Sequence, residues 1–199
     1  MGKISFFVCM LLPLGISAQS LAGRDSADGK GYHILHFQST AGQTSWEESE
    51  FGFGFEHVSG ISLHPRLGIG VGTGLNVLGY GDHKRLVPVF AELRYLPFER
   101  PRHRPFLILD GGYAFAWKDK AEADVFRKVE GGLRMHLAAG VEWKTRSGWA
   151  LMTDFGYLRQ HSALERNNFW WWNGGGGDED FIRETHRMQR WMLRIGLAF

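Results

Sequence analysis

The sequence predicts an all-β fold, an eight-stranded antiparallel up-and-down transmembrane β-barrel with short periplasmic turns and longer extracellular loops. Three observations favour it: an export signal at the N-terminus, about eight segments in which apolar residues alternate with small or polar ones, and the different side-chain sizes on the two faces of those segments.

Residues 1–18 have the parts of a signal peptide. Lys3 supplies the positive start, residues 4–14 are apolar, and Ala18 is a small residue before the expected cut. This apolar run is too short to cross a membrane as a helix, which needs about 20 residues. We therefore expect cleavage after residue 18.

The remaining 199 − 18 = 181 residues suffice for one domain and contain no cysteine, because Cys9 lies in the signal peptide. We expect residues 19–29 to form a short periplasmic segment and residues 30–199 the barrel. Loss of Lys3 takes the net charge from +2 to +1, which argues against nucleic acid as a partner. After the signal peptide, the absence of an 18-residue apolar run argues against membrane-spanning helices.

Period-two alternation indicates the strands, most clearly at 67–75, where Leu, Ile and Val alternate with Gly. Strands are predicted at 30–38, 49–59, 65–77, 85–96, 104–117, 129–144, 148–160 and 186–199. Longer polar connections at 39–48, 78–84, 118–128 and 161–185 interleave with shorter turns. This order places the turns at the periplasmic end and the loops at the extracellular end.

Side-chain size decides which face of the wall meets lipid. A soluble, lipocalin-like barrel would turn its apolar face inward, but eight strands enclose a space that side chains only just fill. One face carries Phe51, Phe53, Phe55, Leu107, Leu109, Tyr113, Phe115, Leu151, Phe155, Leu193, Ile195 and Leu197. The opposite face carries Gly68, Gly70, Gly72, Gly112, Ala114, Gly132, Gly140 and Gly156. The apolar face is therefore predicted to point outward.

Aromatic residues at the strand ends are consistent with this orientation. Tyr and Trp prefer the two membrane interfaces, where one part of the ring is wet. The predicted aromatic girdle comprises Tyr95, Trp143 and Trp149 at the turn end, and Trp117, Tyr157 and Trp191 near the loop end.

The inward positions carry charges of both signs. By parity they are Glu56, Glu92, Arg94, Asp110, Arg134, His136, Glu142, Asp154, Arg190 and Arg194. Buried charges are costly unless they are paired and hydrogen-bonded. The near balance of carboxylates and arginines therefore predicts a lumen filled by salt bridges rather than an open channel.

The signal peptide, the eight alternating segments and the last strand, 190–199, together resemble the small bacterial outer-membrane β-barrel family, which includes OmpA-like barrel domains and Bacteroidetes-type barrels. In that family a terminal strand with alternate apolar residues ending in Phe is read by the barrel-assembly machinery. Leu193, Ile195, Leu197 and Phe199 match that signal. The resemblance implies an outer-membrane location, with membrane lipid, periplasmic chaperones and the assembly machinery as partners.

The favoured function is non-enzymatic: a structural or partner-binding barrel acting through extracellular loops. Trp170, Trp171 and Trp172 in the longest loop are possible contacts for an extracellular ligand, or lie in the lipid headgroup zone. The acidic run 178–180 could hold Ca²⁺, but its spacing favours a solvated tip. No metal or other cofactor is expected.

Two alternative functions follow from other features. The outer-leaflet lipid A deacylase family uses a His-x-Ser pair with a carboxylate, and His57 and Ser59 have that spacing beside Glu56. They lie at the turn end, however, away from outer-leaflet lipid. A small channel is the other alternative, but a narrow, charge-paired interior predicts little conductance.

Overall fold

The structure, a computed structural model, describes residues 31–43, 49–78, 85–98, 103–116, 126–145, 147–167 and 181–199. The expected signal peptide and periplasmic segment, Trp117, the three loop tryptophans and the acidic run 178–180 lie outside the described residues. Within the described part of the chain, no helix is long and apolar enough to cross a membrane.

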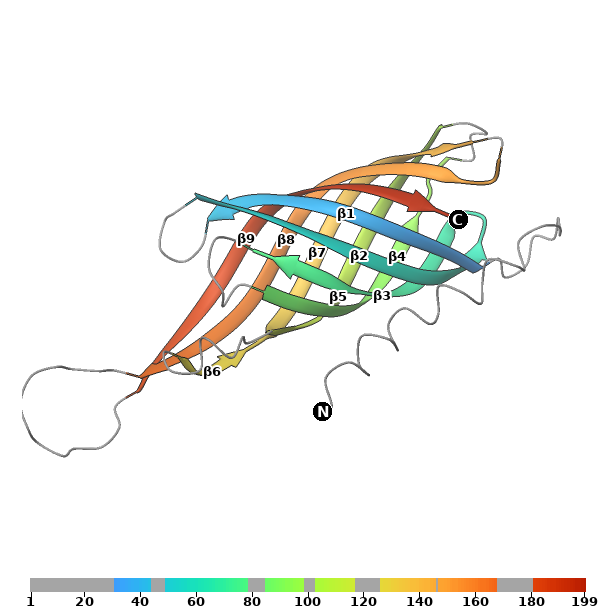
Figure 1. Cartoon of the computed structure of the whole chain (residues 1–199). Coiled ribbons are helices and arrows are strands. Elements are labelled where there is room, and N and C mark those ends of the chain that lie inside the picture. The colour runs from blue at the N-terminus through green and yellow to red at the C-terminus, as the bar shows by residue number, and fades with distance from the viewer. Residues whose placement is uncertain are drawn as a thin grey trace, which may run out of the picture.

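The chain forms one antiparallel sheet that closes on itself (Figure 1). The strands are β1 (Gly31–Gln43), β2 (Ser49–His64), β3 (Leu67–Val77), β4 (Arg85–Tyr95), β5 (His103–Ala116), β6 (Phe126–Glu130), β7 (Gly132–Lys144), β8 (Ala150–Asn167) and β9 (Phe181–Ala198). Gly131 interrupts a single wall strand, because β6 continues along β8 where β7 leaves off. The wall therefore has eight strands.

The seam between the first and last strands closes the barrel. β9 pairs with β8 from Ala150↔Ala198 to Asn167↔Phe181 and with β1 from Ile34↔Ala198 to Gln43↔Gln189. Beyond these ladders, the backbones of His33 and Phe199 exchange two hydrogen bonds of 2.9 Å. Over the stretch from Gln189 to Ala198, β9 therefore has a neighbour on both sides and leaves no free sheet edge, as a membrane requires. The predicted closed, eight-stranded antiparallel fold is confirmed.

Several predicted boundaries are wrong. The segment predicted as a loop at 161–185 is strand at both ends, since β8 continues to Asn167 and β9 begins at Phe181. The first strand likewise extends to Gln43, past the predicted end at residue 38. The pairing of β1 with β9 stops at Gln189, so the outer part of the β8–β9 hairpin has no neighbour on that side. His186 and Met188 in this part are still buried, and beyond them the apolar alternation of the sequence fades.

The outer wall is apolar. Phe37, Phe51 and Leu133 on three different strands are 60–68% exposed, and the outward positions of β5, β8 and β9 are also exposed. Both ends of the barrel carry rings: Trp149 lies 5.9 Å from Phe199 at the turn end, and Trp191 lies 5.4 Å from Phe155 near the loop end. Tyr95 and Trp143 also lie at the turn end, and the ring of Tyr157 meets Trp191 edge-on.

Candidate functional site: the charged lumen

The interior is layered along the barrel axis. An apolar cluster at the turn end comprises Ile34, Val58, Phe90, Leu96, Phe106, Ile108 and Met152. A second, towards the loop end, comprises Leu78, Leu86, Ala114, Leu158, Met188 and Met192. Charged side chains lie between the two clusters. Along β5, for example, Asp110 lies between Ile108 of the first cluster and Ala114 of the second.

Rings inside the barrel lie over glycines of the neighbouring strand. A Cβ added to Gly72 would overlap the Phe90 ring, and one added to Gly140 would overlap the Phe106 ring. Gly72 and Gly140 thus leave room in the lumen for the rings of Phe90 and Phe106. The alternation of the sequence alone does not show where these two rings lie. Both rings are nearly fully buried and belong to the turn-end cluster.

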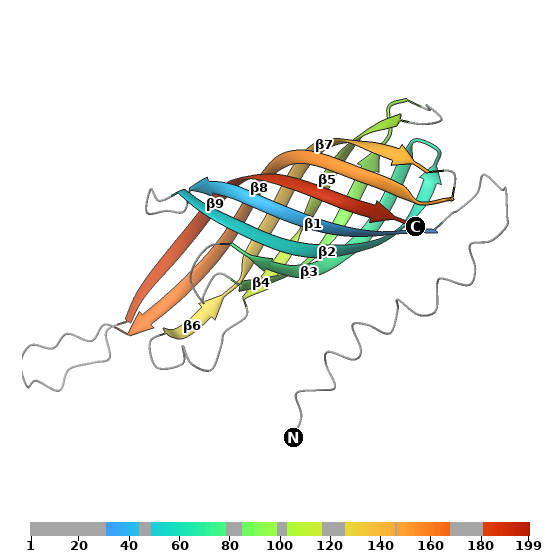
Figure 2. The same ribbon diagram turned by 45° about the horizontal axis from the view of Figure 1, so that its top comes forward.

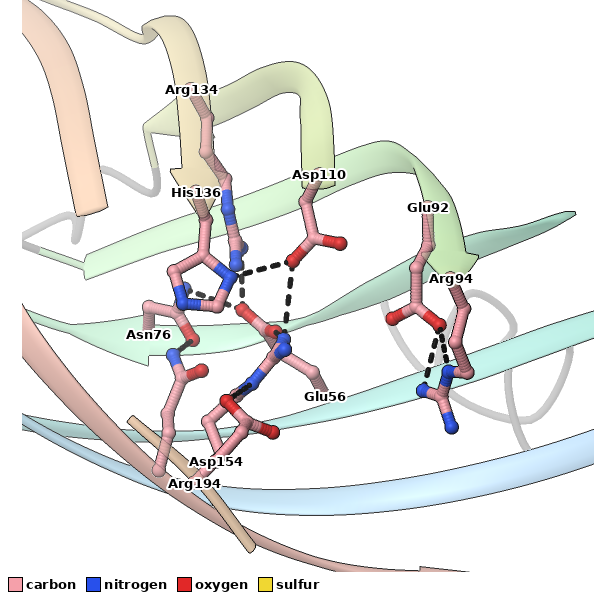
Figure 3. Close-up of polar contacts among 10 residues, drawn as sticks. Glu56, Asn76, Glu92, Arg94, Asp110, Arg134, His136, Asp154 and Arg194 are labelled. Carbon is pink, nitrogen blue, oxygen red and sulfur yellow. Dashed lines mark hydrogen bonds and ion pairs between the residues drawn. The ribbon is translucent and has the colours of Figure 1, made fainter. Parts of the chain in front are cut away.

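Arg194 is at the centre of the charged layer (Figure 3). Its Nε donates to Asp154 Oδ1 at 2.8 Å and its Nη1 to Asp110 Oδ2 at 3.1 Å. Its Nη1 also lies 3.7 Å from Glu56 Oε2. The three carboxylates come from β8, β5 and β2, so one guanidinium on β9 joins four parts of the wall across the lumen.

A second arginine completes this layer. Arg134 of β7 forms an ion pair with Glu56 and lies over the Phe90 ring, 4.4 Å from its centroid. His136 Nδ1 lies 2.8 Å from Asp110 Oδ2, and Asn76 donates to Glu56 at 3.1 Å. The arrangement combines two guanidinium groups with three carboxylates, and Asn76 and His136 form further hydrogen bonds with two of these carboxylates. This is what buried charges require.

A separate pair lies nearer the turn end. The Arg94 guanidinium donates to Glu92 Oε1 at 2.7 and 3.1 Å. It lies 5.5 Å from the Tyr32 ring centroid and 5.2 Å from that of Phe106. Its Nη1 also lies 3.3 Å from Met152 Sδ. Rings and a thioether enclose the cation, so this end of the lumen is filled as well.

The remaining predicted charges lie at the two rims. Arg190 donates to Glu50 at 3.1 Å towards the loop end, while Glu142 lies 3.7 Å from Arg104 towards the turn end. Parity along the alternating strands indicated the charged members of the lumen. Glu50 and Arg104 have the same parity as Glu56 and Asp110 but lie at the ends of the predicted segments 49–59 and 104–117, and they are not among the predicted lumen charges.

The structure buries all ten charged side chains assigned to the interior from the sequence, the most exposed being Glu142 at 8%. It also buries other polar residues that the charge pattern could not reveal, among them His36, Gln38, Thr40, Asn76 and Gln160. Gln38 links to the network by donating to Asn76 at 2.6 Å. The described residues include no group of three or more His, Cys, Asp or Glu placed to hold a metal ion.

The His-x-Ser pair lies on the outer surface of the wall. Ser59 Oγ is 2.9 Å from Nδ1 of His33 on the neighbouring strand, and the rings of His33 and His57 stack at 5.6 Å with an angle of 4° between them. Glu56, beside His57 in sequence, points into the lumen towards Arg134. The nearest carboxylate in the sequence is therefore on the other side of the wall and cannot orient either histidine.

An apolar outer wall around a closed, charge-filled interior is the architecture of small outer-membrane β-barrels. The chain is similar in structure to the crystal structure of Neisserial surface protein A, with 13% identity, a TM-score of 0.56 and coverage of 85% of this chain and 97% of that one. It is also similar to the solid-state NMR structure of the outer membrane protein AlkL, with 10% identity, a TM-score of 0.55 and coverage of 89% and 93%. No family model and no curated protein sequence matches it. The likeness is one of fold.

Proposed function

We propose that this protein is an integral barrel of the bacterial outer membrane that acts as a non-conducting scaffold and contacts an extracellular partner through its loop end. The observation that carries the proposal is the filled lumen, in which apolar layers lie on both sides of a paired charge network. Eight strands enclose no more space than such side chains fill. The interior therefore serves stability, and recognition falls to the surface outside the membrane.

The β8–β9 hairpin supports the second half of the proposal. Its ladder continues to Asn167↔Phe181, well past the last residue pair that β9 makes with β1 (Figure 2). The hairpin projects beyond the rim and continues into a segment whose sequence contains Trp170, Trp171 and Trp172. Large rings carried on such a projection suit contact with a partner. In this proposal they are the ligand-contacting residues.

The membrane orientation follows from the same proposal. The export signal delivers the chain to the periplasm, chaperones and the barrel-assembly machinery insert it, and membrane lipid covers the apolar wall. The turn end then faces the periplasm and the hairpin faces the exterior. A lipid-modifying role for His57 and Ser59 is not favoured, because Glu56, the carboxylate beside the pair in sequence, points into the lumen and pairs with Arg134.

Labelling of introduced cysteines on intact cells tests the location and the orientation together. The sequence after residue 18 has no cysteine, so each variant carries a single thiol. We expect a membrane-impermeant maleimide to label Glu165→Cys on the hairpin directly. Ser147→Cys in the turn between β7 and β8 should react only after the outer membrane is permeabilised. The reverse pattern would invert the topology, and labelling of both only after lysis would contradict surface display.

A further inference from the structure

A groove of about 710 Å³ crosses the outer wall over β2, β3, β4, β5 and β7. Its floor is a row of residues that face one another across the sheet, Ser59, Val71, Ala91, Gly111 and Met135. The groove is deep at Ala91 and Gly111 because their side chains are small. Larger apolar side chains of the adjacent row, Ile61, Ile69, Leu93 and Leu109, lie along one side.

The groove rises along the barrel from one end towards the other. The row begins beside His33 near the turn end of β1 and reaches Met135, which lies midway along the wall strand that β6 and β7 form together. Four strand spacings of about 4.8 Å give the groove a length of roughly 19 Å. With strands tilted by about 40°, it rises roughly 12 Å, which stays within one leaflet of a core about 30 Å thick.

The low end of the groove is polar. Besides the Ser59–His33 contact, His57 and Thr73 face each other across β2 and β3 on the outward side. His33, His57, Ser59 and Thr73 are each partly exposed. Polar side chains on a wall covered by lipid tails are costly, so a ligand that offers hydrogen-bonding oxygens here would be stabilised.

The position of the polar cluster along the barrel axis indicates which ligand the groove can hold. His33 is hydrogen-bonded through its backbone to Phe199, whose ring packs against Trp149 in the turn-end girdle. The polar cluster therefore lies at or just above the membrane interface, and the apolar groove leads from it towards the bilayer centre. A lipid whose headgroup lies at the turn end has the same arrangement, with its polar part at the interface and its acyl chains towards the bilayer centre.

We propose that the groove holds one acyl chain of a glycerophospholipid of the periplasmic leaflet, whose ester and phosphate oxygens meet His33, His57 and Ser59. The inference rests on the membrane orientation proposed above. Gly111 supplies a sharp test, because a Cβ built there has no atom within 4 Å, so a larger residue fills the groove without straining the wall. Ala139 of β7 is the matched control, since it is exposed on the same face outside the groove.

The test uses the folded protein in nanodiscs that contain phosphatidylethanolamine with a diazirine in one acyl chain. We expect photo-crosslinks to concentrate on β3, β4 and β5 at the groove. Gly111→Leu should reduce these crosslinks by about tenfold relative to Ala139→Leu. Resistance of the unboiled protein to SDS shows that each variant is folded. Crosslinks spread evenly around the wall, or equal labelling of the two variants, would overturn the site even if the cysteine labelling supports the orientation.

The polar end is tested with the same diazirine chain on diacylglycerol, which lacks the phosphate. The wild-type protein should prefer the phospholipid, and His57→Leu should abolish that preference while leaving labelling along the groove in place. Unlabelled lipid A, the lipid of the opposite leaflet, should compete less well than unlabelled phosphatidylethanolamine. Stronger competition by lipid A would overturn the assignment to the periplasmic leaflet.

Discussion

Arg194 shows how one side chain can determine the state of its neighbours. It is fully buried, and the carboxylates that surround it come from three other strands. Each of these carboxylates lies in an interior where an unpaired charge is strongly unfavourable. Asp154 depends on Arg194 most, because it has no other ion-pair partner among the described residues. Removing Arg194 should therefore destabilise the fold mainly because it leaves buried carboxylates, above all Asp154, without a cation.

Replacing Arg194 with Leu should lower the free energy of unfolding by about 3–5 kcal/mol, because buried carboxylates lose their partner. Arg104→Leu is the control, since its 3.7 Å pair with Glu142 is partly exposed and should contribute less than about 1 kcal/mol. Urea unfolding in phospholipid vesicles, followed by tryptophan fluorescence, measures both. Equal effects of the two variants would contradict the assigned role of the central network. Adding Asp154→Leu to Arg194→Leu should recover part of the loss.

A second prediction concerns the fit between glycines and rings. Gly72→Ala should destabilise the barrel by about 1–3 kcal/mol, because the added methyl group meets the Phe90 ring in a filled interior. Gly111→Ala faces open space on the outer wall and should change the stability little. In the same unfolding experiment, Phe90→Leu combined with Gly72→Ala should be less harmful than the sum of the single changes. Strict additivity would argue against the contact.

At the scale of the strand, β9 joins the two ends of the sheet. Leu193, Ile195, Leu197 and Phe199 point outward along it and are 36–51% exposed. The same strand carries Arg194 on its inward face, so its two faces serve the membrane and the lumen separately. In the proposed biogenesis the outward face is also what the assembly machinery reads.

Phe199→Ala is expected to reduce the fraction of protein assembled in the outer membrane of cells while leaving refolding of the purified chain in detergent nearly unchanged. Phe37→Ala, an outward change on β1, should affect neither step comparably. The amount of SDS-resistant protein in the membrane fraction measures assembly. If both variants assemble equally well, Phe199 has no special part in recognition.

The strands also show what the sequence could and could not predict. Alternation revealed every strand of the membrane-crossing wall, because each faces lipid on one side and the lumen on the other. It failed at 161–167 and 181–185, where the β8–β9 hairpin leaves that two-sided environment. Parity identified inward charges but not which pairs form: the partnership of Arg194 with Asp110 depends on how strands on opposite sides of the barrel lie in register.

For the whole molecule, the layered interior predicts a protein that does not conduct. Purified protein in planar bilayers should show no steady openings, and unboiled samples should migrate differently from boiled ones in SDS gels. Steady openings of a defined size would contradict the filled lumen and favour the channel alternative. The same recordings on Arg194→Leu would show whether the central network or the apolar layers block ion flow.

The network across the lumen also has a consequence for how the barrel assembles. Arg194 reaches Asp154 in the neighbouring strand but also Asp110 and Glu56 on distant ones, so the full set of contacts exists only when the sheet has curved round and closed. Before that moment Glu56 and Asp110 lack their contacts with Arg194, although Asp110 already faces His136 on the neighbouring strand; afterwards the seam cannot separate without breaking those contacts. The last strand thus carries the residue that completes the interior, and closure of the wall and neutralisation of its contents become a single cooperative event.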